Sequence, residues 1–256
     1  MRSFSNKLLT VRQNPHGLET NRRTWKWVSS LGLLVGLLLP HFPLQADLYY
    51  EQVSSLKPVG AEGQAPSTMK SKVYVRHRMV RAEDVNAKKV IIVRLDKGII
   101  WGLNQNDKTF TELTIKQLEN DWQRARRSAG VTEDPKLSVT VQEDGEEVVN
   151  GYNCRKFTLL ADGQPVMHLW NTTALDVPEK DDLYDYKQIL GAFPKALIDK
   201  ARSLPGFPLR VKAVENIGAG KVETFREIVT VRMEPLDPSL FELPEGFKKV
   251  EVEVKP

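Results

Sequence analysis

The sequence predicts an α+β fold, with one antiparallel sheet or open barrel of about ten short strands and helical inserts on one side. Three observations support this prediction. Short apolar and β-branched runs follow one another along the chain and are separated by turn-forming residues. Two segments, after Leu113 and after Asp182, change to the helical period. No strand–helix–strand alternation appears and no Pro- or Gly-rich linker divides the chain, so residues 47–256 are expected to form a single domain.

The first 46 residues have the order of a secretory signal peptide. Arg22 to Lys26 supplies positive charge before an apolar run that extends from Trp27 to Leu39, and Leu44-Gln45-Ala46 places a small residue at the cleavage position. The run is shorter than the roughly 20 apolar residues that a membrane-spanning helix needs. We therefore expect residues 1–46 to be removed on export to the periplasm, with an uncleaved inner-membrane anchor as the alternative.

The basic balance of the chain comes from this leading segment. Residues 1–46 hold six of the 37 basic and one of the 33 acidic side chains, which leaves 31 basic and 32 acidic residues in the mature part. A nucleic-acid-binding domain needs a basic mature surface. The composition therefore excludes nucleic acid as an expected partner.

The first half of the mature chain reads as five strands. A Gly-, Pro- and Ser-rich stretch over residues 57–71 is expected to be a loop, and Asp96-Lys97-Gly98 is expected to be a tight turn between two β-branched runs. The expected strands are Asp47–Val53, Lys72–Arg81, Ala87–Leu95, Gly98–Leu103 and Thr109–Leu113.

A helix is predicted from Thr114 to Ala129. Thr114 and Gln117 have the spacing of a capping box, in which each side chain bonds the other residue's backbone N–H. Apolar residues at 118, 122, 125 and 129 recur at helical spacing. Arginines gather near the C-terminal end, where the helix macrodipole favours positive charge, and Gly130 ends the helix.

The second half returns to strands around a second helical insert. Glu143 to Glu146 is expected to be a turn, and Pro194 should divide the helical segment of residues 183–201 because proline removes a donor and clashes with the preceding turn. The expected strands are Leu137–Gln142, Gly151–Leu160, Pro165–Asn171, Leu209–Asn216, Lys221–Met233 and an alternating run through Val250, Val252 and Val254.

No pattern in the chain carries recognisable catalytic chemistry. There is no nucleophile elbow, zinc-protease helix or phosphate-binding glycine loop. The mature part has two histidines, His77 and His168, each on a predicted strand. They could bind a metal only if those strands were neighbours, and no paired cysteine or carboxylate at ligand spacing supports this. We expect no catalytic residues, no metal, no cofactor and no enzyme activity.

Six aromatic side chains fall on elements that would share one concave surface if the sheet curls around the helices. The simpler interpretation is that they fill a core. The functional interpretation is that some of them line an apolar cavity. These hydrophobic-cavity candidates are Trp101, Phe110, Trp122, Trp170, Tyr186 and Phe193.

Five blocks stand in a characteristic order along the chain: Ile91–Gly98 with Trp101 and Asn104, Lys108–Glu112, Gly151–Cys154, Phe193-Pro194 and Ser239–Gly246. Together they resemble a bacterial exported family that is catalogued only as a domain of unknown function. The resemblance extends from Asp47 to Val254. The architecture of that family is similar to the LolA-like group, which includes outer-membrane lipoprotein carriers and periplasmic sensors. It implies a curved, open half-barrel with helices packed on its concave face around a lipid-sized cavity.

Three functions remain open on the sequence. The first is a periplasmic, non-enzymatic protein that binds a lipid, an acyl chain or another hydrophobic ligand. The second is an envelope protein-interaction or sensor module without a cavity, docking through the arginines of the helix (Arg124, Arg126, Arg127). The third is an envelope hydrolase, which would require His77 or His168 to converge with an acid–base partner.

Overall fold

The computed structural model describes residues 46–60, 63, 65–128, 137–191, 193–217 and 220–251. The predicted signal peptide, apart from its last residue, lies outside these ranges. So do the predicted end of the first helix at Ala129 and the run beyond Val250 that includes Val252 and Val254.

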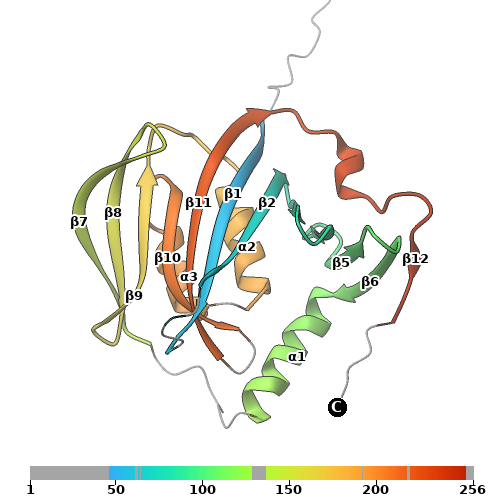
Figure 1. Ribbon diagram of the computed structural model, residues 1–256, viewed down its shortest axis with the longest axis horizontal. Coiled ribbons are helices and arrows are strands. Elements are labelled where there is room, and N and C mark those ends of the chain that lie inside the picture. Colours follow the sequence, from blue (N-terminus) through green and yellow to red (C-terminus); the bar gives the residue numbers. More distant parts are fainter. Residues whose placement is uncertain are drawn as a thin grey trace, which may run out of the picture. The chain divides into compact units, whose positions relative to one another are not determined.

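Twelve strands form one continuous sheet in the described part of the chain (Figure 1). From edge to edge their order is β12, β6, β5, β4, β3, β2, β1, β11, β10, β9, β8, β7. The strands are β1 (Asp47–Pro58), β2 (Ser67–Arg76), β3 (Met79–Asp84), β4 (Lys89–Arg94), β5 (Ile99–Asn104), β6 (Thr109–Thr114), β7 (Val139–Val149), β8 (Tyr152–Ala161), β9 (Gln164–Thr172), β10 (Phe207–Ile217), β11 (Gly220–Glu234) and β12 (Lys248–Lys249).

Two meanders meet at the centre of this sheet. The chain runs outward from β1 to β6, continues at the opposite edge with β7, and returns through β11, which pairs antiparallel with β1 along its whole length. Every strand pairing is antiparallel except the short contact of β12 with β6. The predicted open antiparallel sheet is confirmed, with twelve strands in place of about ten.

One predicted strand, Lys72–Arg81, is wrong, because the chain turns at His77 and Arg78 and forms β2 and β3. This turn contains no glycine, asparagine or proline, so the sequence gives no signal for it. Arg78 has a φ of 55°, and its backbone N–H donates to the Asp182 carboxylate at 2.7 Å. A contact 104 residues away therefore holds a turn that local sequence does not specify.

The predicted turn at Glu143 to Glu146 is also wrong. The strand β7 continues through it with a bulge in its pairing to β8, and the chain turns later, at Asn150 and Gly151, which both have positive φ. The acidic residues lie along β7, where the Glu143 carboxylate accepts two hydrogen bonds from Arg155 on β8.

Three α-helices are described, namely α1 (Ile115–Ser128), α2 (Lys180–Ile189) and α3 (Lys195–Arg202). The predicted capping box is present: the Gln117 backbone N–H donates to Thr114 Oγ1 at 3.0 Å, and the Thr114 N–H donates to Gln117 Oε1 at 2.8 Å. Pro194 divides α2 from α3, as predicted, and stands at the N-cap position of α3.

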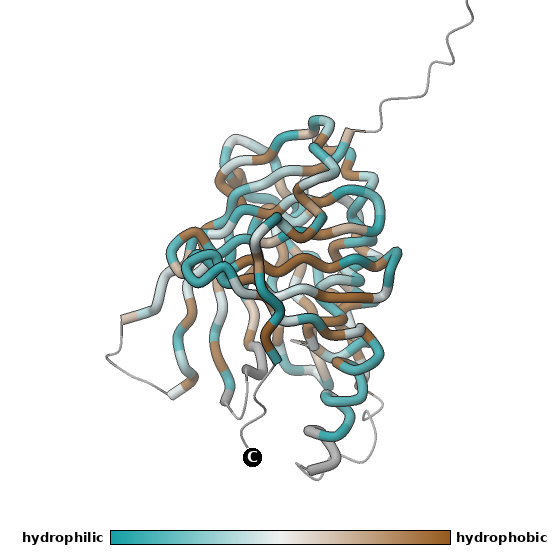
Figure 2. The backbone as a smooth tube through the Cα atoms, turned by 90° about the vertical axis from the view of Figure 1, so that its right-hand side faces the viewer, coloured by the Kyte–Doolittle hydropathy of each residue, from teal (hydrophilic) through white to brown (hydrophobic). Residues whose placement is uncertain are grey.

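The sheet curves around α2 and α3 (Figure 1), and this helix-covered side is called the concave face below. Apolar and polar residues alternate along many strands (Figure 2), so each face collects its own side chains. On the concave face Leu48 and Tyr50 of β1 pack with Val73 and Val75 of β2 and with Leu183 of α2. A second cluster, around Phe157 and Leu159 of β8, packs against α3.

The opposite, outer face of β1 to β6 is covered by residues 235–250, which we call the C-terminal strap. The strap contains a 3-10 turn, η1 (Pro238–Phe241), which contacts β3 and β4. Phe241 is fully buried there, in a cluster with Tyr49, Ile92 and Trp101.

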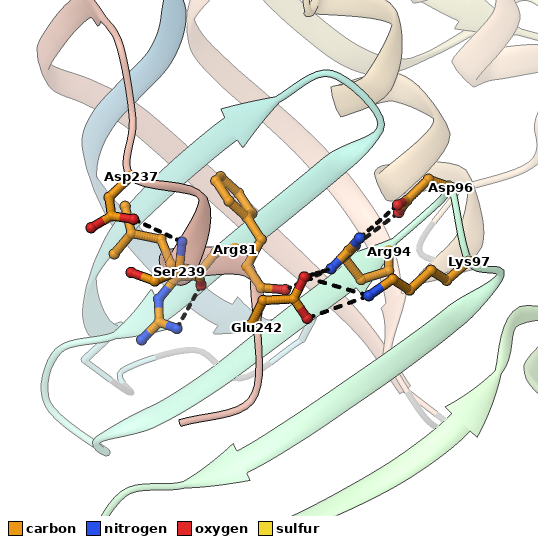
Figure 3. A network of polar contacts seen from close by, with 9 residues as sticks. Arg81, Arg94, Asp96, Lys97, Asp237, Ser239 and Glu242 are labelled. Carbon is orange, nitrogen blue, oxygen red and sulfur yellow. Dashed lines mark hydrogen bonds and ion pairs between the residues drawn. The ribbon is translucent and has the colours of Figure 1, made fainter. Parts of the chain in front are cut away.

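Arginines of the sheet hold the backbone of this strap (Figure 3). Arg76 donates to the Leu236 carbonyl at 2.7 Å, and Arg81 donates to the Leu240 carbonyl at 3.0 Å. Arg94 lies between Asp96, at the β4–β5 turn, and Glu242 of the strap. The outer face of β1 to β6 is thus closed by the chain's own C-terminal segment, which leaves the concave face of these strands as the place for a site.

Candidate functional site

A cavity of about 390 Å³ lies on the concave face, between the sheet and the α2–α3 region. Its floor includes a row of side chains that are neighbours across four strands, because Tyr50 pairs with Val73, Val73 with Ala82, and Ala82 with Ile91. The apolar lining also includes Met167 and Leu169 of β9, Tyr186 and Leu190 of the α2 segment, and Phe193.

This space is too large to be a packing defect. Protein interiors contain few voids larger than a water molecule. The volume lies within the range of roughly 300–1,000 Å³ that small-molecule sites occupy. The cavity therefore has the size of a ligand site.

A polar row borders the apolar one. One step along the strands from Tyr50, the side chains of Gln52, Ser71, Asp84 and Lys89 are successive cross-strand neighbours on the concave face, and all four line the cavity. Arg226 of β11 lines it as well. The site is therefore amphipathic, with an apolar floor next to a band of polar groups.

Three tyrosines of the lining are buried deeply enough to change their chemistry. Burial raises the pKa of Tyr50 and of Tyr184 well above the ordinary value. Burial also raises the pKa of Tyr186 to about 12, and the positive charge of Arg226 opposes this rise. All three hydroxyls stay neutral at physiological pH, so they can offer hydrogen bonds but no negative charge.

A second hollow, of about 570 Å³, lies beside the cavity between α1 and the end of α2. Trp122 of α1 lines it and is 39% exposed, and Phe193 lines both this groove and the cavity. The Trp122 ring lies directly over Gly191, where an added Cβ would meet it at 2.8 Å. The first turn of α1 thus packs on the core, while Trp122 stays partly accessible.

A family described as a domain of unknown function (DUF4412) matches residues 61–247, well over half of the chain. The chain belongs to this family. The expected membership of a family with that description is confirmed, and the matched range of the DUF4412 chain includes most of the cavity lining and most of the strap. No curated protein matches this chain.

The solved structures that this DUF4412 chain resembles share little sequence with it. An uncharacterized conserved protein from Thermus thermophilus is 12% identical, with a TM-score of 0.45, over 82% of this chain and 92% of that chain. The LolA superfamily protein NE2245 from Nitrosomonas europaea is 9% identical, with a TM-score of 0.35, over 78% and 91%. The Pseudomonas aeruginosa MucA/MucB complex is 10% identical, with a TM-score of 0.35, over 77% and 56%.

The six aromatic candidates do not share one surface in the structure. Tyr186 and Phe193 line the cavity, and Trp122 lines the neighbouring groove. Trp101 and Phe110 belong to the outer-face cluster under the C-terminal strap.

The sixth candidate, Trp170, is cross-strand from Arg210 and Lys156, which both stack on its ring, and its Nε1–H donates to Glu147. The two-residue period of a strand explains this separation for the candidates that lie on strands. Successive side chains point to opposite faces of the sheet, and the register with neighbouring strands decides which of the two alternating sets faces the helices.

Several lining residues carry no sequence signal of their own. Tyr50 stands beside Tyr49 in the sequence, yet the two lie on opposite faces. Met69 lies in the stretch expected to be a loop, which β2 partly occupies. Arg226 is one of many charged residues on β11. The alternation in β1 could have grouped Tyr50 with Gln52. Only the pairing with β2 and β11 shows which of the two alternating sets of β1 side chains faces the cavity.

The two histidines are not brought together. His77 lies in the β2–β3 turn, and His168 lies on β9, with β1, β11 and β10 between these parts of the sheet. The Thr158 hydroxyl is 2.7 Å from His168 Nδ1 and also bonds Asp144, while burial lowers the pKa of His168. Within the described ranges no three potential metal ligands gather, and no helix is both long and apolar enough to cross a membrane.

Proposed function

We propose that this chain is an exported, periplasmic, non-enzymatic protein that holds a lipid, an acyl chain or another hydrophobic ligand in the cavity on its concave face. One observation carries the proposal, namely the apolar cavity of about 390 Å³ between the sheet and the α2–α3 region. Export is proposed from the leading sequence, through residues 1–46.

The chemistry of the lining supports this assignment. Aliphatic, methionine and aromatic side chains form most of it, and such surfaces gain free energy when an apolar chain displaces water, at roughly 25 cal/mol per Å². Four of the polar lining groups form one row across the strands (Gln52, Ser71, Asp84 and Lys89), and polar contacts of this kind fix the orientation of an otherwise apolar ligand. Among the described residues that line the cavity there is neither a histidine nor a cysteine.

Ala82→Phe is expected to block the cavity. Ala82 is half-buried on the floor between Val73 and Ile91, so a phenyl ring at this position enters the space that a ligand would occupy. Native mass spectrometry of wild-type protein from the periplasmic fraction should show a co-purified amphiphile that is absent from the variant. The intact mass of the same sample tests cleavage after Ala46.

Ala161→Phe is the matched control, because Ala161 is also half-buried on a strand but does not line the cavity. It should retain the amphiphile. Wild-type protein that carries no amphiphile and binds no fluorescent fatty-acid probe would refute the proposed function.

The alternative is an envelope interaction module, and the exposed Trp122 at the groove beside α1 is the observation that favours it. This alternative requires a protein partner whose capture depends on the exposed surface of α1 and not on the cavity. A partner retained by Ala82→Phe and lost in Trp122→Ala would support it.

A further inference from the structure

Two tyrosine hydroxyls of the cavity lining have no hydrogen-bond partner among the residues that the structure describes. Tyr50 is 6% exposed and Tyr186 is half-buried, and they line the cavity from the sheet and from α2. Neither hydroxyl is bonded to another described residue, whereas the Tyr184 hydroxyl donates to the Ala201 carbonyl at 3.2 Å. Buried tyrosines usually place the O–H on a partner. The hydroxyls of Tyr50 and Tyr186 are therefore available to a ligand.

These two hydroxyls lie near each other. Burial is the main reason that the pKa of Tyr50 is raised, and the neighbouring Tyr186 hydroxyl raises it further. Both groups stay protonated at physiological pH, so each presents a donor. An acceptor atom between the sheet tyrosine and the helix tyrosine can receive both O–H groups.

Two further uncharged groups lie on the same wall of the cavity. Gln52 follows Tyr50 on the same face of β1 and is the cross-strand neighbour of Ser71 on β2. Ser71 is 6% exposed, and both residues line the cavity. Neither side chain makes a hydrogen bond to a residue in the described ranges. Since amides and hydroxyls both donate and accept, this wall offers uncharged hydrogen bonds beside the apolar row.

The charged side chains of the lining are engaged elsewhere or exposed. Asp84 accepts two backbone N–H groups of the β3–β4 turn, each at 2.9 Å, and Glu83 accepts an arginine Nε of its own strand at 2.6 Å. Arg226 and Lys187 both have interactions within the chain, and Lys89 is exposed. Burying a ligand charge without a free counter-charge is costly. The lining therefore favours a polar group that is uncharged.

We propose that the ligand is an uncharged acyl ester, whose carbonyl oxygen accepts the hydroxyls of Tyr50 and Tyr186 and whose alcohol part lies beside Gln52 and Ser71. Its acyl chain lies along the apolar floor of the cavity. This inference rests on the proposed function and specifies its ligand class. The ester should be preferred to an ether, which lacks the carbonyl, and to a free carboxylate, which carries a charge.

The test compares three lipids of one chain length. Monopalmitoylglycerol has the ester carbonyl, hexadecylglycerol has an ether in its place, and palmitate is charged. Each competes, below its micelle concentration, with a fluorescent acyl probe on the full chain. Two hydrogen bonds to the carbonyl predict that the ester binds about tenfold more tightly than the ether. Palmitate should also bind more weakly than the ester, because its charge loses water. Ether or palmitate binding as tight as that of the ester would overturn this inference.

Tyr50→Phe and Tyr186→Phe remove only the hydroxyls. Each should weaken binding of the ester about threefold and leave binding of the ether unchanged, so the preference for the ester disappears in the double variant. Tyr74→Phe is the matched control, because Tyr74 packs in the outer-face cluster, and it should keep the preference.

Thermal unfolding separates a ligand role of these hydroxyls from a structural one. Because neither hydroxyl has a hydrogen-bond partner in the described part of the chain, the ligand-free variants should be as stable as wild type. A clear loss of stability, or an ester preference that survives in the double variant, would overturn this inference alone. Failure of all three lipids to compete would also refute the proposed function.

Discussion

Arg94 is the residue that joins two segments far apart in the sequence. Its Nη2 and Nε donate to the Asp96 carboxylate at 2.6 and 2.8 Å, its Nη1 donates to the Phe241 carbonyl at 3.3 Å, and it pairs with Glu242. The side chain is only 7% exposed. The sequence interpretation of Asp96 as a turn former is therefore incomplete, since its carboxylate also orients the arginine that holds the C-terminal strap.

Arg94→Met is expected to destabilise the protein by about 2 kcal/mol. Removing one partner of a buried charge pair leaves the other charges unpaired, and the partial exposure of Asp96 and Glu242 keeps the effect below the upper range for such losses. Urea unfolding measures the change. Lys97→Gln is the control, with less than about 0.5 kcal/mol expected, because Lys97 is 46% exposed and lies 3.4 Å from Glu242.

Wild type and Arg94→Met should differ less in their free energy of unfolding in acid. The hydrogen bond from Arg94 lowers the pKa of Asp96; for Glu242, burial alone would raise the pKa, but the bond from Arg94 outweighs it and the pKa is lowered. Depressed pKa values stabilise the folded state above the ordinary carboxyl value of about 4, and this stabilisation is lost as pH falls through the folded values. A stability difference that stayed constant from pH 7 to pH 3 would contradict this account.

At the scale of the element, the contact between α1 and the end of α2 depends on one glycine. Gly191 has a φ of 69°, which glycine adopts easily, and its missing side chain leaves room for the Trp122 ring. The helix α1 itself was predictable, because the capping box is a local signal. The position of its Trp122 was not, since it depends on a turn that lies beyond three further strands and the helix α2 in the chain.

Gly191→Ala is expected to cost about 2–3 kcal/mol, because a left-handed backbone strains alanine and the new Cβ collides with Trp122. Gly163→Ala should cost only about 1 kcal/mol, because Gly163 also has positive φ but has open space around it. Thermal unfolding compares the two. In a Trp122→Ala background the excess cost of Gly191→Ala should disappear; an excess that persisted there would rule out the proposed collision.

At the scale of the whole molecule, the sheet has one face sealed by the chain itself and one face that holds a cavity. The outer face of β1 to β6 is sealed by the C-terminal strap, with Phe241 fully buried at its centre. The concave face carries the helices and keeps an open cavity. Stability and ligand binding should therefore respond to different residues.

Phe241→Ala is expected to destabilise the protein by about 3–5 kcal/mol, the usual cost of removing a buried phenyl group. Below the unfolding transition, the affinity for a fluorescent acyl probe should remain within about twofold of wild type, because the cavity lies on the other face. Phe247→Ala, at the only partly buried end of the strap, should cost less. A large loss of affinity in folded Phe241→Ala protein would show that the two faces are coupled.

Local patterns in the sequence determined the α+β class, the capping box at Thr114, the break at Pro194 and most strand positions. They failed at the His77-Arg78 turn and at the β7 bulge, because a carboxylate on α2 and pairing with β8 decide those places. The blocks that contain Lys97 and Glu242 were both visible in the sequence. That they touch was not, because 145 residues separate the two side chains.

The sequence by itself determined which residues are apolar and which alternate, and it selected two of the cavity residues, Tyr186 and Phe193. Only the tertiary structure decided that Trp101 and Phe110 lie on the outer face and that Arg226 lies inside. The physical reason is the two-residue period of a strand. A strand offers two sets of side chains, and only its register with neighbouring strands and the position of the helices determine which set faces the cavity.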